Sequence, residues 1–211
     1  MRYRELLGAP YNAASKIKTK PTMEPVSVDE VHRHCRIDTS LEAQHVAALI
    51  EAVRQEVEAI TGRQFITATW ELYLDALPCD GVIELPHQPL RSVSGVEYRD
   101  EDGTWLTFAT GNYEVQPFYS LTESVDIDLS PGRIVLLPDA EWPDLYDAPA
   151  SVRITFVAGH GDDAARVPAR AKQAMLHRIA ESFERRELGV AGTIYTPTRT
   201  FSDLVRPLVV R

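Results

Sequence analysis

The stretch "FVAGHGDDAARVPARAKQAMLHRIAESFERRE" (residues 156–187) decides how the chain is divided. Its first residues end a run that alternates with a period of two, and its last residues carry apolar side chains at three- and four-residue steps. Glycine and aspartate between the two patterns are typical of a turn, and Pro168 suits the first turn of a helix. We therefore expect a β region to end near residue 158 and a helix to begin at Pro168.

The same stretch contains a candidate metal site at residues 159–163, where one imidazole and two carboxylates could ligate a divalent ion. We favour a simple turn, because glycine and aspartate are the ordinary residues of a strand-to-helix connection. A second cluster, "HRHC" (residues 32–35), cannot converge on one ion, since helical neighbours at i and i+2 point to different faces. His177 is expected at the edge of the last helix's apolar stripe rather than as a base.

Two helices are predicted upstream. "SVDE" (residues 27–30) has the spacing of a capping box, so a short helix should run from there to about Ile37. A longer helix, capped by Thr39 or Ser40, should end at Gly62. Its buried face is expected to comprise Val46, Leu49, Ile50, Val53, Val57 and Ile60, which recur with the helical period.

From Phe65 onward, apolar residues recur at every second position instead of every third or fourth. "FITATWELYLD" (residues 65–75) alternates apolar and polar side chains as a half-buried antiparallel strand does. Further short strands are predicted at residues 81–85, 92–99, 104–108, 112–116, 124–129, 133–137 and 151–158. Close spacing of short strands favours an antiparallel sandwich or partial barrel.

These elements define an α+β fold. A small helical bundle, discontinuous in sequence, is built from residues 26–63 and 167–187, and an antiparallel β domain of residues 64–158 is inserted into it. Residues 1–25 are expected to form an N-terminal arm, and residues 188–211 an extended C-terminal tail that is rich in proline, glycine and β-branched residues.

The net charge of −9 is unevenly distributed. Residues 1–20 carry five basic side chains and one acidic one, and residues 188–211 carry three basic and one acidic, so the middle of the chain is acidic. An acidic body repels phosphates, which argues against specific nucleic-acid binding. No apolar run is long enough to span a bilayer and no secretory signal is present, so we expect a protein made in the cytoplasm. Cys35 and Cys79 are expected to be free thiols.

Catalysis finds no support in the sequence. GxSxG, HExxH, P-loop, Rossmann and CxxC motifs do not occur. Acids at 139–144 and 123–128 could be paired as in a glycosidase, but such pairs arise by chance in an acidic domain. Trp105, Tyr119 and Tyr146 could form a sugar-binding platform, although we favour packing roles for them. We expect no catalytic residue, no cofactor and no metal.

The order of segments over residues 25–187 resembles that of the head–tail connector, or adaptor, proteins of tailed phages and gene transfer agents. The most specific parts of the resemblance are Thr61-Gly62-Arg63, the strand from Thr67 to Trp70, Leu85-Pro86, Pro89, "VEYRDEDG" (residues 96–103), Gly159, Val167-Pro168 and Arg186-Glu187.

The resemblance implies a structural virion protein rather than an enzyme. It implies a ring of about twelve subunits in the virion neck, beneath the portal protein and above a stopper or tail-terminator protein. DNA would pass through the ring's channel without sequence-specific binding, and no membrane would be involved. Two alternatives remain open from the residues: a carbohydrate-binding β module and a cell-wall-active hydrolase of a phage.

The basic ends are the expected contact sites. The predicted portal-binding residues are Arg199, Phe201, Leu204, Val205, Arg206, Leu208 and Arg211, and the predicted arm contacts are Arg2, Arg4, Lys16, Lys18 and Lys20. Both ends are expected to order only on docking. Truncation after Glu187 should then leave the fold intact and abolish portal attachment.

Overall fold

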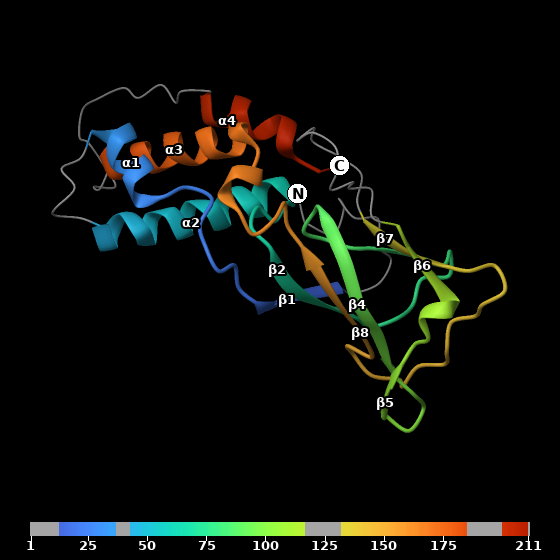
Figure 1. The fold of residues 1–211 in the computed structure, drawn as a ribbon. Coiled ribbons are helices and arrows are strands. Elements are labelled where there is room, and N and C mark those ends of the chain that lie inside the picture. The colour runs from blue at the N-terminus through green and yellow to red at the C-terminus, as the bar shows by residue number, and fades with distance from the viewer. Residues whose placement is uncertain (1–12, 37–42, 117–131, 185–199, 211) are drawn as a thin grey trace, which may run out of the picture.

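The chain divides into a helical end and a β end (Figure 1). The computed structural model describes residues 13–36, 43–116, 132–184 and 200–210. Helices from both ends of the sequence lie together, and the strands between them form two antiparallel sheets. The α+β fold class predicted from the sequence is therefore confirmed.

The bundle contains α1 (Val28–Cys35), α2 (Ala43–Thr61), α3 (Ala169–Glu184) and the short α4 (Thr200–Val205). The predicted capping box begins α1. The Ser27 amide donates to Glu30 Oε2 at 2.7 Å, and the Glu30 amide donates to Ser27 Oγ at 3.2 Å. Gly62 ends α2 with a φ of 68°, as a left-handed residue after a helix does. The predicted caps Thr39 and Ser40 lie outside the described residues.

The buried face of α2 differs from the predicted one at its last position. Val46, Ile50, Val53 and Val57 are buried as expected, and Leu49 is half-buried. Ile60, by contrast, is 46% exposed. Three- and four-residue steps from Val57 reach both positions 60 and 61, and the stripe continues through Thr61, which is fully buried. The prediction for Ile60 is wrong because steps of three and of four residues both fit a helix, so spacing alone did not decide whether position 60 or position 61 is buried.

Among the described residues, the larger sheet has five strands in the order β1-β2-β8-β4-β5, and the smaller has three in the order β3-β7-β6. The strands are β1 (Ala13–Thr19), β2 (Ala68–Leu74), β3 (Val82–Glu84), β4 (Leu90–Arg99), β5 (Trp105–Thr107), β6 (Tyr113–Gln116), β7 (Arg133–Leu136) and β8 (Val152–Ala158). Every ladder between them is antiparallel. The strand predicted at 124–129 lies outside the described residues.

The two sheets share one apolar core, separate from the core of the bundle. The larger sheet contributes Leu72, Ile154 and Phe156, and the smaller contributes Ile83 and Ile134, all nearly or fully buried. This common core makes the β region one unit.

Both ends of the chain differ from the expected loose extensions. Residues 13–19 form strand β1, which pairs with β2 at the edge of the larger sheet. Residues 200–205 form α4, and the 3₁₀ helix η4 (Arg206–Leu208) follows it. The expectation of an extended tail is therefore wrong for residues 200–208. Apolar residues at positions 201, 204, 205 and 208 have helical spacing, which the surrounding proline and β-branched residues obscured.

Candidate docking segment and the polar network at its base

The 159–163 segment is the turn between β8 and the 3₁₀ helix η3 (Ala164–Arg166). Gly159 has a φ of 133°, and a Cβ there would lie 2.7 Å from the Thr67 Cα atom, so the close approach of two backbones requires glycine. The His160 ring lies against Phe65 with centroids 6.4 Å apart. Burial, together with the charge of Arg63, lowers the pKa of His160 to about 4.

The other histidines and the cysteines show no arrangement suited to a metal ion. His34 and His177 meet edge to face with ring centroids 5.5 Å apart, and both are exposed. Among the residues that the structure describes, no three His, Cys, Asp or Glu side chains are grouped closely enough to hold a metal. Cys35 and Cys79 are both thiols outside any disulfide, as predicted.

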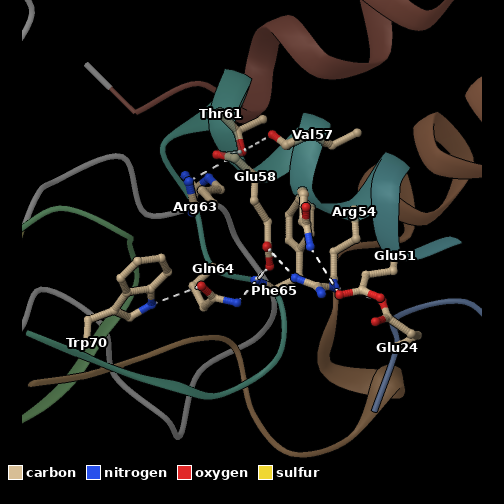
Figure 2. A network of polar contacts seen from close by, with 11 residues as sticks. Glu24, Glu51, Arg54, Val57, Glu58, Thr61, Arg63, Gln64, Phe65 and Trp70 are labelled. Atoms are coloured by element: carbon tan, nitrogen blue, oxygen red, sulfur yellow. Dashed lines mark hydrogen bonds and ion pairs between the residues drawn. The ribbon is translucent and has the colours of Figure 1, made fainter. Parts of the chain in front are cut away.

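A buried polar network lies where α2 meets the β domain, with Glu58 at its centre (Figure 2). Glu58 Oε1 accepts hydrogen bonds from Gln64 Nε2 at 2.8 Å and from the Phe65 amide at 3.0 Å. Its Oε2 atom accepts one from Arg54 at 2.7 Å. Burial raises the pKa of Glu58 to about 6, although the Arg54 charge and the donated hydrogen bonds oppose that shift.

From α2 the network reaches two other parts of the chain. Arg54 Nε donates to Glu24 Oε2 at 2.7 Å, which attaches the segment before α1. Gln64 Oε1 accepts from Trp70 Nε1 at 3.0 Å, which attaches strand β2. These contacts connect α2 to the segment before α1 and to strand β2.

The C-terminal segment 200–210 is attached to the same end of α2. Arg63, which is 1% exposed, donates from Nε to the Leu208 carbonyl oxygen at 2.6 Å. The Val210 amide donates to the Thr61 carbonyl oxygen at 2.9 Å. The segment therefore has a defined position on its own chain.

The predicted portal-binding residues fall into three groups. Val205 and Leu208 are buried in the core of the bundle, so this conformation leaves them no surface for a partner. Phe201 and Leu204 are half-buried, with the Arg178 guanidinium 5.7 Å from the Phe201 ring centroid. Arg206 is exposed. Arg199 and Arg211 lie outside the described residues.

The predicted arm contacts are likewise divided. Lys16 and Lys20 are exposed, and Lys18 Nζ lies 3.0 Å from Glu71 Oε1 within the chain. Arg2 and Arg4 lie outside the described residues.

The features considered for an enzyme or a sugar-binding module do not converge in the described residues. Trp105 lies against the guanidinium groups of Arg99 and Arg153, at 5.2 and 4.6 Å from its ring centroid. Tyr146 packs beside Gly103. The acids at 139, 141 and 144 are exposed, while Tyr119 and the acids at 123–128 lie outside the residues that the structure describes.

Sequence reasoning missed the roles of Arg54, Glu58 and Arg63. No structural role was predicted for Arg54 and Glu58, yet Arg54 is only 6% exposed. The available signal was their i,i+4 spacing with opposite charge, which permits a pair but does not show whether another domain covers it.

The geometry defines a helical bundle with an inserted two-sheet β domain and a folded C-terminal segment. No protein-family model matches the chain, and neither does any curated protein. Within the described residues, no helix is long and apolar enough to cross a membrane.

Three solved structures that are similar to this chain come from particles of a gene transfer agent. A chain from "Virion of native gene transfer agent (GTA) particle" is similar with a TM-score of 0.74 and 21% identity, over 93% of this chain and 95% of that one. A chain from "Neck of empty GTA particle computed with C6 symmetry" gives 0.72 and 21%, over 94% and 96%. A chain from "Neck of native GTA particle computed with C12 symmetry" gives 0.69 and 20%, over 96% of both.

Proposed function

We propose that this chain is the head–tail connector subunit of a phage-like particle, which forms a ring in the virion neck and joins the portal to the stopper or tail. The observation that carries the proposal is the likeness of fold over nearly the whole of both chains to proteins from the virion and neck of a gene transfer agent. The ring is expected to have twelve copies, in keeping with the C12 symmetry of one of those necks.

The C-terminal segment is the proposed portal contact. Since Arg63 and Thr61 hold residues 208 and 210 on the bundle, α4 and η4 present a surface of fixed shape. Arg206 and the exposed parts of Phe201 and Leu204 are its described contact residues, joined by Arg199 and Arg211. The positive charges of Arg199, Arg206 and Arg211 suit an acidic portal surface.

The ring's channel is proposed to conduct DNA without binding it. The net charge of −9 disfavours the counterion-releasing contacts through which proteins hold a phosphate backbone. The role is structural, with no catalytic step.

The test is cryo-electron microscopy of particles produced with this protein and with an Arg199→Glu/Arg206→Glu/Arg211→Glu variant. We expect multiple copies of the normal chain in a ring beneath the portal. The variant should fold normally but be missing from the neck. Particles in which the neck ring consists of another protein would refute the proposal, whereas normal attachment of the variant would refute only the portal contact.

A further inference from the structure

The larger sheet carries opposite charges at its two edges. At one edge, β1 and the residue after it bear Lys16, Lys18 and Lys20, with no acidic residue between positions 13 and 20. We call this the basic edge. At the other edge, the hairpin that joins β4 to β5 contains Asp100, Glu101 and Asp102.

A second acidic segment reinforces the hairpin. The connection from β7 to β8 carries exposed Asp139, Glu141, Asp144 and Asp147 and has no lysine or arginine between positions 137 and 150. The Tyr146 amide donates to the Arg99 carbonyl oxygen at 3.0 Å, which holds this segment against the end of β4. We call residues 100–102 and 139–147 together the acidic loops.

The basic edge and the β4–β5 hairpin are well separated in one subunit. Neighbouring strands lie about 4.8 Å apart, so the four steps from β1 to β5 amount to about 19 Å. In Figure 1, β1 lies on one side of the sheet and the β4–β5 hairpin lies on the other. This separation exceeds the screening length of about 8 Å at physiological salt, so the hairpin acids do not neutralise the basic edge within the chain.

The basic edge is also open for contact. β1 is the outermost strand of its sheet among the described strands, and most of its residues are exposed. Its inner side is held by the ladder to β2, by the ion pair of Lys18 with Glu71 and by the hydrogen bond between Ser15 Oγ and His87 Nε2 at 3.1 Å. Lys16 and Lys20 are exposed beyond these attachments.

A closed ring of identical subunits needs two different, complementary surfaces on opposite sides of each subunit. We propose that the basic edge of one subunit docks on the acidic loops of the next copy of this chain. This proposal rests on the proposed ring. Edge lysines can also serve only to prevent strand pairing, so the test must distinguish contact from protection.

Zero-length carbodiimide cross-linking of assembled particles tests the contact directly. It joins an amine to a carboxylate only when the two touch. Four strand steps separate the basic edge from β5 within a subunit, so a link between Lys16 or Lys20 and an acid of residues 100–102 must form between subunits. We expect such links in wild-type particles and their loss in a Lys16→Glu/Lys20→Glu variant.

Charge reversal tests whether the contact drives assembly. Lys16→Glu/Lys20→Glu alone, or Glu141→Lys/Asp144→Lys alone, should lower the number of copies in the neck about ten-fold, because like charges then face one another. The four changes combined in one chain should restore it, since the reversed surfaces are again complementary.

Arg33→Glu and Glu51→Lys make the same kinds of charge change on exposed helical positions and should leave the copy number unchanged. Wild-type particles that have the ring but lack these cross-links, or single-surface reversals that leave the ring complete, overturn this inference while the connector role stands. Reversals that alter only DNA retention also overturn it, because the lysines then face the channel. Absence of the chain from the neck overturns both proposals.

Discussion

The Nε atom of Arg63 lies 2.6 Å from the carbonyl oxygen of Leu208, which is 145 positions further along the chain. The hydrogen bond is buried, and Arg63 is among the largest fully buried side chains. A charged group removed from water is tolerated only where polar partners surround it. The C-terminal segment therefore supplies part of the environment that makes a buried Arg63 possible, and it belongs to the folded bundle.

Arg63→Ala should lower the free energy of unfolding by roughly 2–4 kcal/mol, because it removes a charged hydrogen bond, leaves the Leu208 oxygen unsatisfied and opens a cavity. Urea unfolding followed by circular dichroism measures the change. Arg33→Ala, at an exposed position of α1, should change it by less than about 0.5 kcal/mol. Equal effects of the two variants would contradict the assigned role of Arg63.

Substitutions at Leu208 and Arg206 should have different effects. The first should lower the stability of the fold, and the second should weaken attachment to the portal. Leu208 is fully buried, so Leu208→Ala should cost about 2–4 kcal/mol of stability. Arg206 is exposed, so Arg206→Ala should leave the unfolding midpoint nearly unchanged and weaken binding to the portal. Thermal unfolding and co-sedimentation with portal particles measure the two effects. A Leu208→Ala protein as stable as the wild type would show that the segment is not part of the core.

These burials also revise the expectation for truncation after Glu187. The sequence favoured a tail that could be removed without loss of the fold, but Val205 and Leu208 complete the bundle's core. Removal should expose the apolar surface beneath them. A truncation that loses portal attachment therefore cannot by itself distinguish a lost contact from a weakened fold.

Local patterns predicted much of the fold because their causes are local. The capping box at Ser27 and Glu30, the stop at Gly62 and the alternation through β2 each depend on neighbouring residues. The strand β1 was missed because AASKIKT shows little alternation, and its pairing with β2 depends on residues fifty or more positions away.

The candidate site was less accessible to sequence reasoning. Spacing places Arg54 beside Glu58, but their burial depends on Glu24, Gln64 and Phe65, which tertiary packing brings to them. The sequence shows only that β1 is rich in basic residues and that the acidic loops are rich in acidic ones. Their places at opposite edges follow from the strand order, which no local pattern specifies.

Glu58 should make the protein less stable as pH rises from about 4.5 to about 6. Its pKa is raised from 4.5 to about 6 in the folded state, so the folded form binds the proton more tightly and loses that advantage as the proton leaves. The shift corresponds to about 2 kcal/mol. The wild type's stability relative to a Glu58→Gln variant should therefore fall by about this amount between pH 4 and pH 7, as measured by urea unfolding at each pH. A constant difference would show that Glu58 titrates normally.

His160 should have the opposite pH dependence. Its pKa is lowered from 6.5 to about 4 by burial and by Arg63, so the unfolded chain takes up a proton first as pH falls. Its stabilising contribution is complete above pH 6.5 and is lost toward pH 4, a change of about 3 kcal/mol. His160→Gln cannot titrate, so the wild type's stability relative to this variant should shrink by that amount between pH 7 and pH 4. Urea unfolding at both pH values measures it, and His34→Gln, an exposed histidine, serves as the control. If the wild type instead became more stable relative to His160→Gln as pH falls, His160 would be gaining a proton in the folded state. The turn would then have to hold a charged imidazole.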